Sequence, residues 1–379
     1  MFSTRWMIAG LAGSMMLATP AWSQGSSMPW GISSDQVAWE VFTLIASPAG
    51  QPGRKSVVFE TWASDQDLYA TNPPVWPPVT APKKLQPSLL DTAKAAHSQR
   101  LLAIAPGTPC KVPRPPGVGN FPPSPACIAE EVRRNWDTFQ FVVSNNLNTT
   151  AGLVAAFSNP VPISLPSGAI EVKADWVKVS DMLKWIPALT SPEQVRTLYY
   201  TSTATVSGIA DEYALVGLAM SSKQISDWVW MTFEHQLSPG RCDTIGCHDA
   251  FGAVMANVQP ASQPNTNYGE CAKTPQLLAM LTAASIDKVW LNYCLKGSQI
   301  TFGTATAPTL LGNSVIERIN AGVPLNKSSC ITCHSYASFD QKGAPNFDGL
   351  DDFTGPTNPQ LLQGFKTNDF LWGILAIRN

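Results

Sequence analysis

Apolar residues recur at helical spacing in residues 33–47 and 127–147, so we expect a helix in each segment. The first segment opens with serine and aspartate, residue types that favour a helix start. The apolar positions are Val37, Val41, Leu44 and Ile45 in the first segment and Ile128, Val132, Trp136, Phe139 and Val143 in the second. The stretch between them, residues 48–125, is rich in proline, which interrupts helices and central strands, and we expect it to be irregular.

The middle of the chain has a different period. In residues 169–179, AIEVKADWVKV, the apolar residues Ile170, Val172, Ala174 and Trp176 alternate with polar ones, which is typical of a half-buried strand. The segments VRTLYYTSTATV, EYALVGLAM and DWVWMTFEH are also rich in branched and aromatic residues. We therefore predict a mostly antiparallel sheet between about 165 and 236.

Helical character returns at residues 274–284 and 309–320. The whole pattern predicts an α+β fold, with a mostly antiparallel β middle region and many proline-rich loops. We divide the chain into a helical and proline-rich region at 24–160, a β-rich region with cysteine-stapled loops at 161–300, and a third region at 301–379.

The first 23 residues have the order of a secretory signal peptide. Arg5 is followed by an apolar run from Trp6 to about Leu17 and then by the small residues Ala18, Ala21 and Ser23. The run is shorter than the ~20 residues that cross a bilayer. Export with cleavage near Ser23, or after Ala21, therefore fits better than a retained anchor. We expect a periplasmic or secreted protein with no transmembrane anchor after cleavage.

Composition excludes some classes of partner. The predicted signal peptide contains one basic residue and no acid, so the rest keeps 24 of 25 basic and all 27 acidic residues, a net charge of −3. That balance provides no basic surface for nucleic acid or an anionic membrane. The remaining length is enough for one large domain or two ordinary ones.

All eight cysteines lie beyond the predicted signal peptide, at positions 110, 127, 242, 247, 271, 294, 330 and 333. In an exported protein an even number of cysteines indicates disulfides, together with any pairs that hold a cofactor. Proximity in the sequence suggests the disulfides Cys110–Cys127 and Cys271–Cys294, each closing a loop that has little core of its own.

Residues 330–334 read Cys-Ile-Thr-Cys-His, the C-x-x-C-H spacing of covalent haem attachment. Two thiols at this spacing meet the two vinyl groups of the porphyrin, and the histidine that follows binds iron as the proximal ligand. A redox-active dithiol would favour a thioredoxin-like context, and a zinc site would need two further ligands at comparable spacing. We therefore predict haem c attached to Cys330 and Cys333, with His334 as the iron ligand.

On this motif the chain resembles the c-type cytochromes from about residue 305 onward. The resemblance implies that residues 301–379 form a mainly helical, cytochrome c-like haem-binding region, and that the protein takes part in electron transfer. The segments AIEVKADW and DWVWMTFEH are also similar to parts of a group of secreted bacterial cytochrome-like proteins of unestablished chemistry.

The second axial ligand departs from the simplest cytochrome pattern, because neither methionine nor histidine follows His334. A sixth iron ligand must come from upstream, unless a weaker donor serves, or the position stands open. His97 lies in a polar helical stretch and is expected at the surface, whereas His235 ends a predicted strand and is either a ligand or active-site group or a hydrogen-bonded core residue. Met231 and Met255 are expected to fill the core.

A second cysteine cluster leaves alternatives open. Cys242 and Cys247 are separated by four residues and followed by His248. This C-x4-C-H spacing is a variant of haem attachment, which would make His248 the iron ligand of a second haem. The simpler interpretation is a disulfide that closes a tight loop, since Gly240 and Gly246 allow the turn, and His248 would then remain a candidate distal ligand. A different metal site would also use Asp243 or Asp249.

Three functions are compatible with these features. The first is a periplasmic electron-transfer cytochrome, and the second is a haem enzyme, a peroxidase or oxygenase, with an open or displaceable distal site and one or two haems. Glu234, His235, Arg241 and His248 are the candidate catalytic groups. The third is a haem subunit that docks on a dehydrogenase. The redox partner would be a dehydrogenase, a cytochrome or an oxidase. The two-haem peroxidases normally carry two C-x-x-C-H motifs, whereas this chain has one.

The size of the chain argues against the plainest electron-transfer protein. A haem-wrapping domain needs roughly 100 residues, and a large β-rich region remains. That region contains the tryptophans Trp176, Trp185, Trp228 and Trp230. Extra structure of this size indicates a substrate pocket or a partner surface, although aromatic residues in sheets are most often core.

Overall fold

The computed structural model describes residues 32–50, 56–78, 83, 85, 128–206, 209–320, 323–350 and 354–377. The predicted signal peptide, His97 and the predicted Cys110–Cys127 disulfide lie outside these residues. The predicted disulfide Cys271–Cys294 is confirmed. Among the described residues, the structure contains no helix with the length and apolar character needed to span a bilayer.

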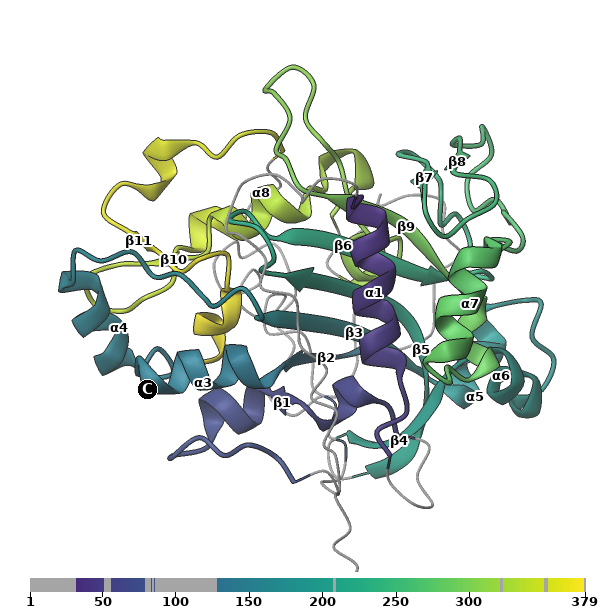
Figure 1. The fold of residues 1–379 in the computed structure, drawn as a ribbon, viewed down its shortest axis with the longest axis horizontal. Coiled ribbons are helices and arrows are strands. Elements are labelled where there is room, and N and C mark those ends of the chain that lie inside the picture. The colour runs from purple at the N-terminus through teal and green to yellow at the C-terminus, as the bar shows by residue number, and fades with distance from the viewer. Residues whose placement is uncertain are drawn as a thin grey trace, which may run out of the picture.

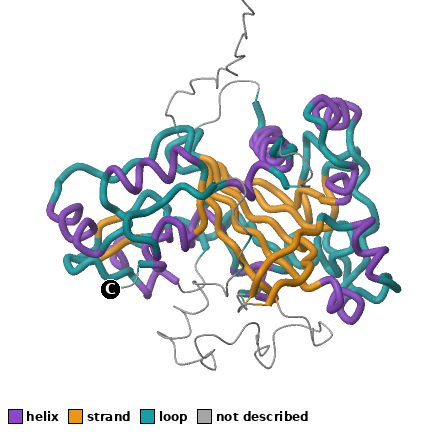
Figure 2. Tube along the Cα trace, turned by 90° about the horizontal axis from the view of Figure 1, so that it is seen from below, coloured by secondary structure: helices purple, strands orange, loops and turns teal. Residues whose placement is uncertain are grey.

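A seven-stranded antiparallel sheet lies at the centre of the protein, with helices and loops on both sides of it (Figure 2). The strand order is β1-β2-β3-β5-β6-β9, and β4 pairs with β5. The strands are β1 (Ala63–Ser64), β2 (Ile128–Arg134), β3 (Ile170–Lys178), β4 (Thr201–Val206), β5 (Ile209–Ser222), β6 (Val229–His235) and β9 (Tyr293–Gln299).

Helices and short ladders surround the sheet (Figure 1). The α-helices are α1 (Ser34–Ala46), α3 (Trp136–Ser144), α4 (Thr150–Ser158), α5 (Val179–Trp185), α6 (Pro192–Leu198), α7 (Pro275–Ala283) and α8 (Cys330–Ser335). The short helical turns are η1 (Val58–Thr61), η2 (Gln66–Ala70), η3 (Lys288–Asn292), η4 (Ile316–Asn320), η5 (Leu325–Lys327), η6 (Phe347–Leu350), η7 (Pro359–Leu362) and η8 (Trp372–Ala376). Two further strand pairs are β7 (Cys247–His248) with β8 (Asn257–Val258), and β10 (Ser338–Phe339) with β11 (Lys366–Thr367).

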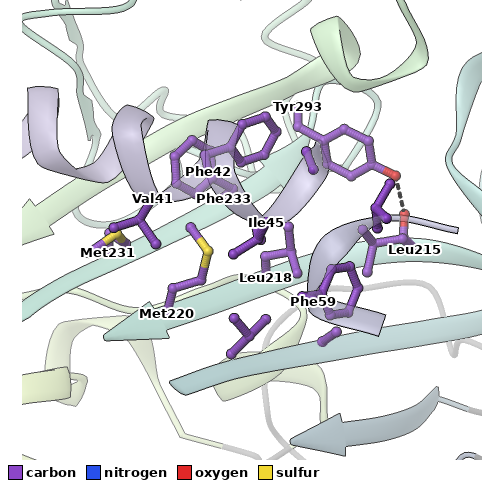
Figure 3. Close-up of a cluster of buried hydrophobic side chains, with 14 of the residues drawn as sticks. Val41, Phe42, Ile45, Phe59, Leu215, Leu218, Met220, Met231, Phe233 and Tyr293 are labelled. Atoms are coloured by element: carbon purple, nitrogen blue, oxygen red, sulfur yellow. Dashed lines mark hydrogen bonds between the residues drawn. The ribbon is translucent and has the colours of Figure 1, made fainter. Parts of the chain in front are cut away.

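One face of the sheet packs against α1, which lies across the strands (Figure 1). Phe42 of α1 stacks on Phe233 of β6 with ring centroids 4.5 Å apart, and Trp39 meets the same ring edge-on at 4.9 Å. The side chains of Met220 and Met231 belong to this core beside α1 (Figure 3). The core is apolar because successive strand residues point to opposite faces, so one set of alternate positions faces α1.

The opposite face of the sheet carries the other set of alternate positions and is rich in charge. On β3 these are Glu171, Lys173 and Asp175, and on β2 they include Glu130 and Arg134. Asp175, Glu130 and Arg134 are buried. The described residues from Asn313 onward, called the C-terminal segment below, lie against this face. The cover is fixed by hydrogen bonds to the sheet, which are described with the site below.

Three sequence predictions are confirmed in this fold. The predicted helix at 33–47 is α1, whose cap residue Ser33 accepts a hydrogen bond from the Gln36 amide. The predicted helix at 274–284 is α7. The predicted antiparallel sheet is present, and it is larger than predicted because β2 and β9 extend it on either side.

The predicted helix at 127–147 is wrong in its first half. Residues 128–134 form β2, which pairs with β3 along its whole length, and the helix α3 begins only at Trp136. Asn135 marks the boundary, because its side chain accepts a hydrogen bond from the Thr138 amide and caps α3. Glutamate and arginine favour helix locally, but strand pairing overrides that preference here.

Two further segments differ from prediction. The segment VRTLYYTSTATV is not wholly extended, since Pro192–Leu198 forms α6 before β4 begins. Residues 309–320 are helical only in η4, at their end. The mainly helical cytochrome c-like region at 301–379 is not confirmed. Its described residues contain one α-helix, the six-residue α8, with short turns and the β10–β11 pair.

The core against α1 yields a stability prediction. Ile45 is fully buried, whereas its neighbour Leu44 is 46 % exposed. Ile45→Ala should lower the free energy of unfolding by about 2–5 kcal/mol, because it removes buried methyl groups and leaves a cavity. Leu44→Ala is the matched control and should change it by less than about 0.5 kcal/mol. Denaturant unfolding of both variants measures the difference, and equal effects would contradict the packing of α1 described above.

Candidate functional site

The C-x-x-C-H motif lies on α8, and all three of its predicted functional residues line one cavity beneath the C-terminal segment. The cavity has a volume of about 140 Å³ open to the centres of water molecules, roughly ten times the space that one water needs. The sheet contributes Glu130, Val132 and Arg134 of β2, Glu171 and Lys173 of β3, Ala219, Met220 and Ser221 of β5, and Trp230 and Met231 of β6. The other walls come mainly from Glu317, residues 327–330, Cys333, His334 and η8.

Small side chains on β5 create this space. Ala219 and Ser221 line the cavity between Lys173 on β3 and Trp230 on β6. The register pairs Ala219 with Lys173 on one side, and Ser221 with Trp230 on the other. Large side chains therefore stand on both sides of a strand that carries small ones, so the sheet surface has a trough that the C-terminal segment bridges.

His334 is held as a neutral, oriented imidazole. Its Nδ1 lies 2.8 Å from the carbonyl oxygen of Phe370, so Nδ1–H is the donor and the ring has a fixed tautomer. No hydrogen bond is found at Nε2 within the described residues. The ring packs on Trp230 with centroids 4.5 Å apart. Burial lowers the pKa of His334 to about 4, and the charge of Lys173 also lowers it. A neutral histidine with Nδ1–H engaged is the form that binds metal through Nε2.

The two thiols of the motif are compatible with attachment of a haem. Within the described residues neither Cys330 nor Cys333 is in a disulfide bond. Burial raises the pKa of the Cys330 thiol, so it stays protonated. Trp372 Nε1 donates a hydrogen bond to the Cys333 carbonyl at 3.2 Å and ties η8 to the helix. Two thiols and a neutral imidazole on one short helix, all facing one cavity, fit the attachment and iron ligation of a haem.

The cavity wall opposite α8 is charged. Arg134 pairs with Asp65 and, at 2.7 Å, with Glu171. Lys173 Nζ lies 2.7 Å from the carboxylate of Glu130. On β3 these charges alternate with apolar residues, a pattern that sequence reasoning interpreted as a half-buried strand, and the charged residues of β2 were assigned to a helix. They were missed as cavity residues because nothing local shows that a later part of the chain covers the strands.

His235 is a core residue, which was one of its two predicted roles. Its Nε2 lies 3.0 Å from the carbonyl oxygen of Leu198, and its Nδ1 accepts a hydrogen bond from the Leu237 amide. The ring stacks on Tyr199 with centroids 3.5 Å apart. With both ring nitrogens occupied and no place among the residues lining the cavity, His235 is not positioned to bind iron or a substrate there.

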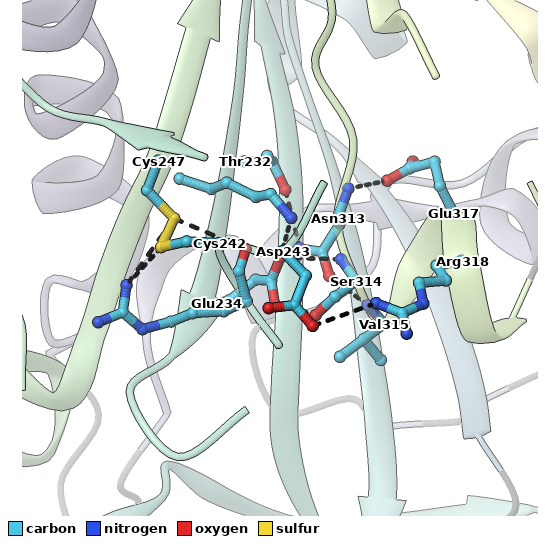
Figure 4. Close-up of polar contacts among 12 residues, drawn as sticks. Thr232, Glu234, Cys242, Asp243, Cys247, Asn313, Ser314, Val315, Glu317 and Arg318 are labelled. Atoms are coloured by element: carbon cyan, nitrogen blue, oxygen red, sulfur yellow. Dashed lines mark hydrogen bonds and ion pairs between the residues drawn. A yellow bond between two sulfur atoms is a disulfide. The ribbon is translucent and has the colours of Figure 1, made fainter. Parts of the chain in front are cut away.

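Glu234 and Arg241 also serve the structure, and the prediction of a catalytic role for them is not supported by their contacts. Glu234 is fully buried, pairs with Lys296 at 3.1 Å and accepts a hydrogen bond from the Ser314 amide at 2.8 Å (Figure 4). Arg241 is buried, and its guanidinium lies 3.1 Å from the sulfur of Cys242 and 3.0 Å from the carbonyl oxygen of Gly269. Neither residue lines the cavity.

The second cysteine cluster contains a disulfide between Cys242 and Cys247, with Cα atoms 5.0 Å apart (Figure 4). Thiols joined in this way are not available to a second haem, so of the alternatives open in the sequence the structure contains the disulfide. Among the described residues, the structure contains no group of three or more His, Cys, Asp and Glu side chains placed to hold a metal ion. The contacts of Cys242 and Cys247 therefore favour the disulfide over a second haem or a metal site at Asp243 or Asp249.

His248 follows this disulfide but lies away from the cavity. Its side chain is 55 % exposed, with Nδ1 2.8 Å from Asn257 Oδ1 and Nε2 3.3 Å from Asp35 Oδ2. It is not among the residues that line the cavity, so it does not supply a distal ligand. Met231 is a core residue as predicted, whereas the same prediction for Met255 is wrong, because Met255 is 70 % exposed.

The chain matches no known family model, and no curated protein or solved structure is significantly similar to it. The functional argument therefore rests on the residues of the cavity and on their chemistry.

The buried state of His235 predicts a pH dependence of stability. Burial lowers the pKa of this histidine from 6.5 to about 3. Below pH 6.5 the unfolded chain binds a proton that the folded chain does not. His235 therefore contributes stability that is complete above pH 6.5 and is lost as pH falls toward 3. The loss should approach about 1.4 kcal/mol per pH unit.

The test compares wild type with His235→Gln, whose amide keeps a donor and an acceptor but does not titrate. Between pH 6.5 and 5 the unfolding free energy of the wild type should fall with decreasing pH more steeply than that of the variant. The difference between the two slopes should correspond to about one bound proton. Denaturant titrations at several pH values measure both slopes. Equal slopes would mean that His235 takes up a proton in the folded state.

Proposed function

We propose that this chain is an exported haem c protein that passes electrons through a haem held by Cys330, Cys333 and His334. The observation that carries the proposal is the convergence of these three side chains on one cavity under the C-terminal segment. Covalent attachment would retain the haem outside the cell, and the donor or acceptor would be a dehydrogenase, a cytochrome or an oxidase.

The residues around the cavity have clear roles in this proposal. A bound haem supplies reversible one-electron chemistry at its iron. The Phe370 carbonyl orients the His334 ring through Nδ1, and Trp230 limits its rotation by packing on it. The sheet and the C-terminal segment exclude bulk water. Two disulfides and the absence of a membrane-spanning helix among the described residues are consistent with export.

A second function, a haem enzyme with an accessible distal site, is favoured by the composition of the cavity wall. His334 is the one histidine among its described lining residues. The two methionines that touch the cavity, Met220 and Met231, direct their side chains into the core against α1 (Figure 3). The described wall therefore offers charged groups in place of a strong second iron ligand, which suits a site for a small oxidant.

Haem attachment is tested by mass and by spectrum. The wild type, expressed with haem-attachment machinery, should keep the mass of one haem after denaturation. Cys330→Ser combined with Cys333→Ser should lose it, because no thiol remains on α8 to form a thioether. His334→Ala should alter the absorbance spectrum, because the proximal ligand is removed. Ser335→Ala, on the same helix, is the control and should retain the added mass of one haem and the wild-type spectrum. A double cysteine variant that keeps covalent haem would refute the proposal.

Carbon monoxide separates the two functions. We expect the ferrous protein to bind carbon monoxide, because no histidine or methionine side chain from the described wall faces His334 across the cavity. Binding is measured from the absorbance change on titration with the gas. A ferrous protein that resists saturating carbon monoxide would have a strong sixth ligand, and the enzyme function would be withdrawn in favour of simple electron transfer.

A further inference from the structure

Lys173 stands on the cavity wall that faces α8 across the trough. It lies on β3 and is paired with Ala219 of β5. The small side chain of Ala219 leaves space above the sheet at this point of the cavity. Trp230 lies on β6, on the other side of β5 from β3, and its ring packs against the ring of His334. Two strand spacings, about 10 Å, separate β3 from β6. Lys173 and His334 therefore border the same space from opposite sides.

The charge of Lys173 acts within this space. Its side chain is 20 % exposed, and its partner Glu130 is 5 % exposed. The guanidinium of Arg134 is engaged by the carboxylates of Asp65 and Glu171. Lys173 is therefore a cation on the sheet wall of the cavity that also contains the predicted iron ligand.

We propose that the space between Lys173 and His334 is a binding site for a small anion with a donor atom for iron, such as a hydroperoxide, and that the Lys173 ammonium donates a hydrogen bond to it. An ammonium group has three N–H donors, so it can contact several acceptors at once, Glu130 and a ligand among them.

This inference rests on the proposed haem function and deepens it, because it assigns the distal group and the class of ligand. It also assigns a role to a half-buried cation at the side of the cavity where the sequence left the sixth iron ligand open. Glu317 lines the same cavity. It repels a bound anion only weakly, because burial raises the pKa of its carboxyl and so reduces its negative charge.

The test uses fluoride, a small anion that binds ferric haem and accepts hydrogen bonds. Ferric wild type and Lys173→Met are titrated with sodium fluoride, and the dissociation constant is read from the absorbance change. Lys173→Met should weaken binding by about tenfold to a hundredfold, as expected for the loss of a charged donor. Lys178→Met is the matched control, because Lys178 is on the same strand and pairs with Asp211 away from the cavity. It should leave the constant unchanged.

Two further variants keep the test interpretable if Lys173→Met folds poorly. Lys173→Met combined with Glu130→Gln removes both members of the pair, so that no carboxylate is left buried without its partner. It should show the same loss of fluoride affinity. Lys173→Arg keeps a charged donor and should retain affinity to within a few-fold.

The outcomes separate the two proposals. A wild type without covalent haem would refute the proposed function itself. A wild type with one haem whose fluoride affinity equals that of both Lys173→Met variants would overturn only the role of Lys173. A ferric wild type that binds no fluoride would also overturn the site, because an anion could not reach the iron.

Discussion

The structure depends on burying both faces of one antiparallel sheet, although only one of those faces is apolar. Along β3 the apolar residues Ile170, Val172, Ala174 and Trp176 face α1, and the charged residues between them face the C-terminal segment. Charges removed from water must be paired. Glu130 with Lys173, and Arg134 with Glu171, meet that requirement across adjacent strands. The pairing fixes the register of β2 on β3, and the need for a cover fixes where the C-terminal segment lies.

Asn313 and Ser314 hold the C-terminal segment against the sheet. Asn313 donates hydrogen bonds to Thr232 Oγ1 at 2.8 Å and to the Phe233 carbonyl at 3.0 Å, and Ser314 binds Glu234 (Figure 4). Further along, the Ile331 amide donates to Gln299 Oε1 at 3.0 Å, which anchors α8 to β9. These contacts satisfy buried polar groups of the sheet, and they compete with helix formation before η4. The same bonds that make the segment irregular therefore bring the cysteines and His334 to the cavity.

The local parts of this arrangement could be predicted from the sequence, whereas the long-range contacts could not. Spacing alone predicted the helix α1, the central strands and the Cys271–Cys294 disulfide, because each depends on residues close in the chain or on a simple period. It also singled out Cys330, Cys333 and His334, which line one cavity. Residues 128–134 were assigned to a helix because glutamate and arginine favour helix, and only their long-range pairing with β3 makes them a strand. Lys173 and Trp230 were visible as strand residues, but their place in a cavity depends on a cover supplied by another part of the chain. Candidates chosen for their chemistry alone, such as Glu234 and His235, lie in buried structural networks.

Buried ion pairs are a weak source of stability, since well-packed apolar residues of similar volume often stabilise a fold as much or more. A sheet that needed only a second apolar face could carry leucine or valine at 130, 171 and 173, and the trough over Ala219 and Ser221 could be filled. The chain instead keeps small residues on β5 and paired charges on β2 and β3, beside a neutral histidine whose Nδ1 is already engaged. Packing against the C-terminal segment does not require that combination. A polar, partly open environment beside an oriented imidazole suits the redox centre proposed above.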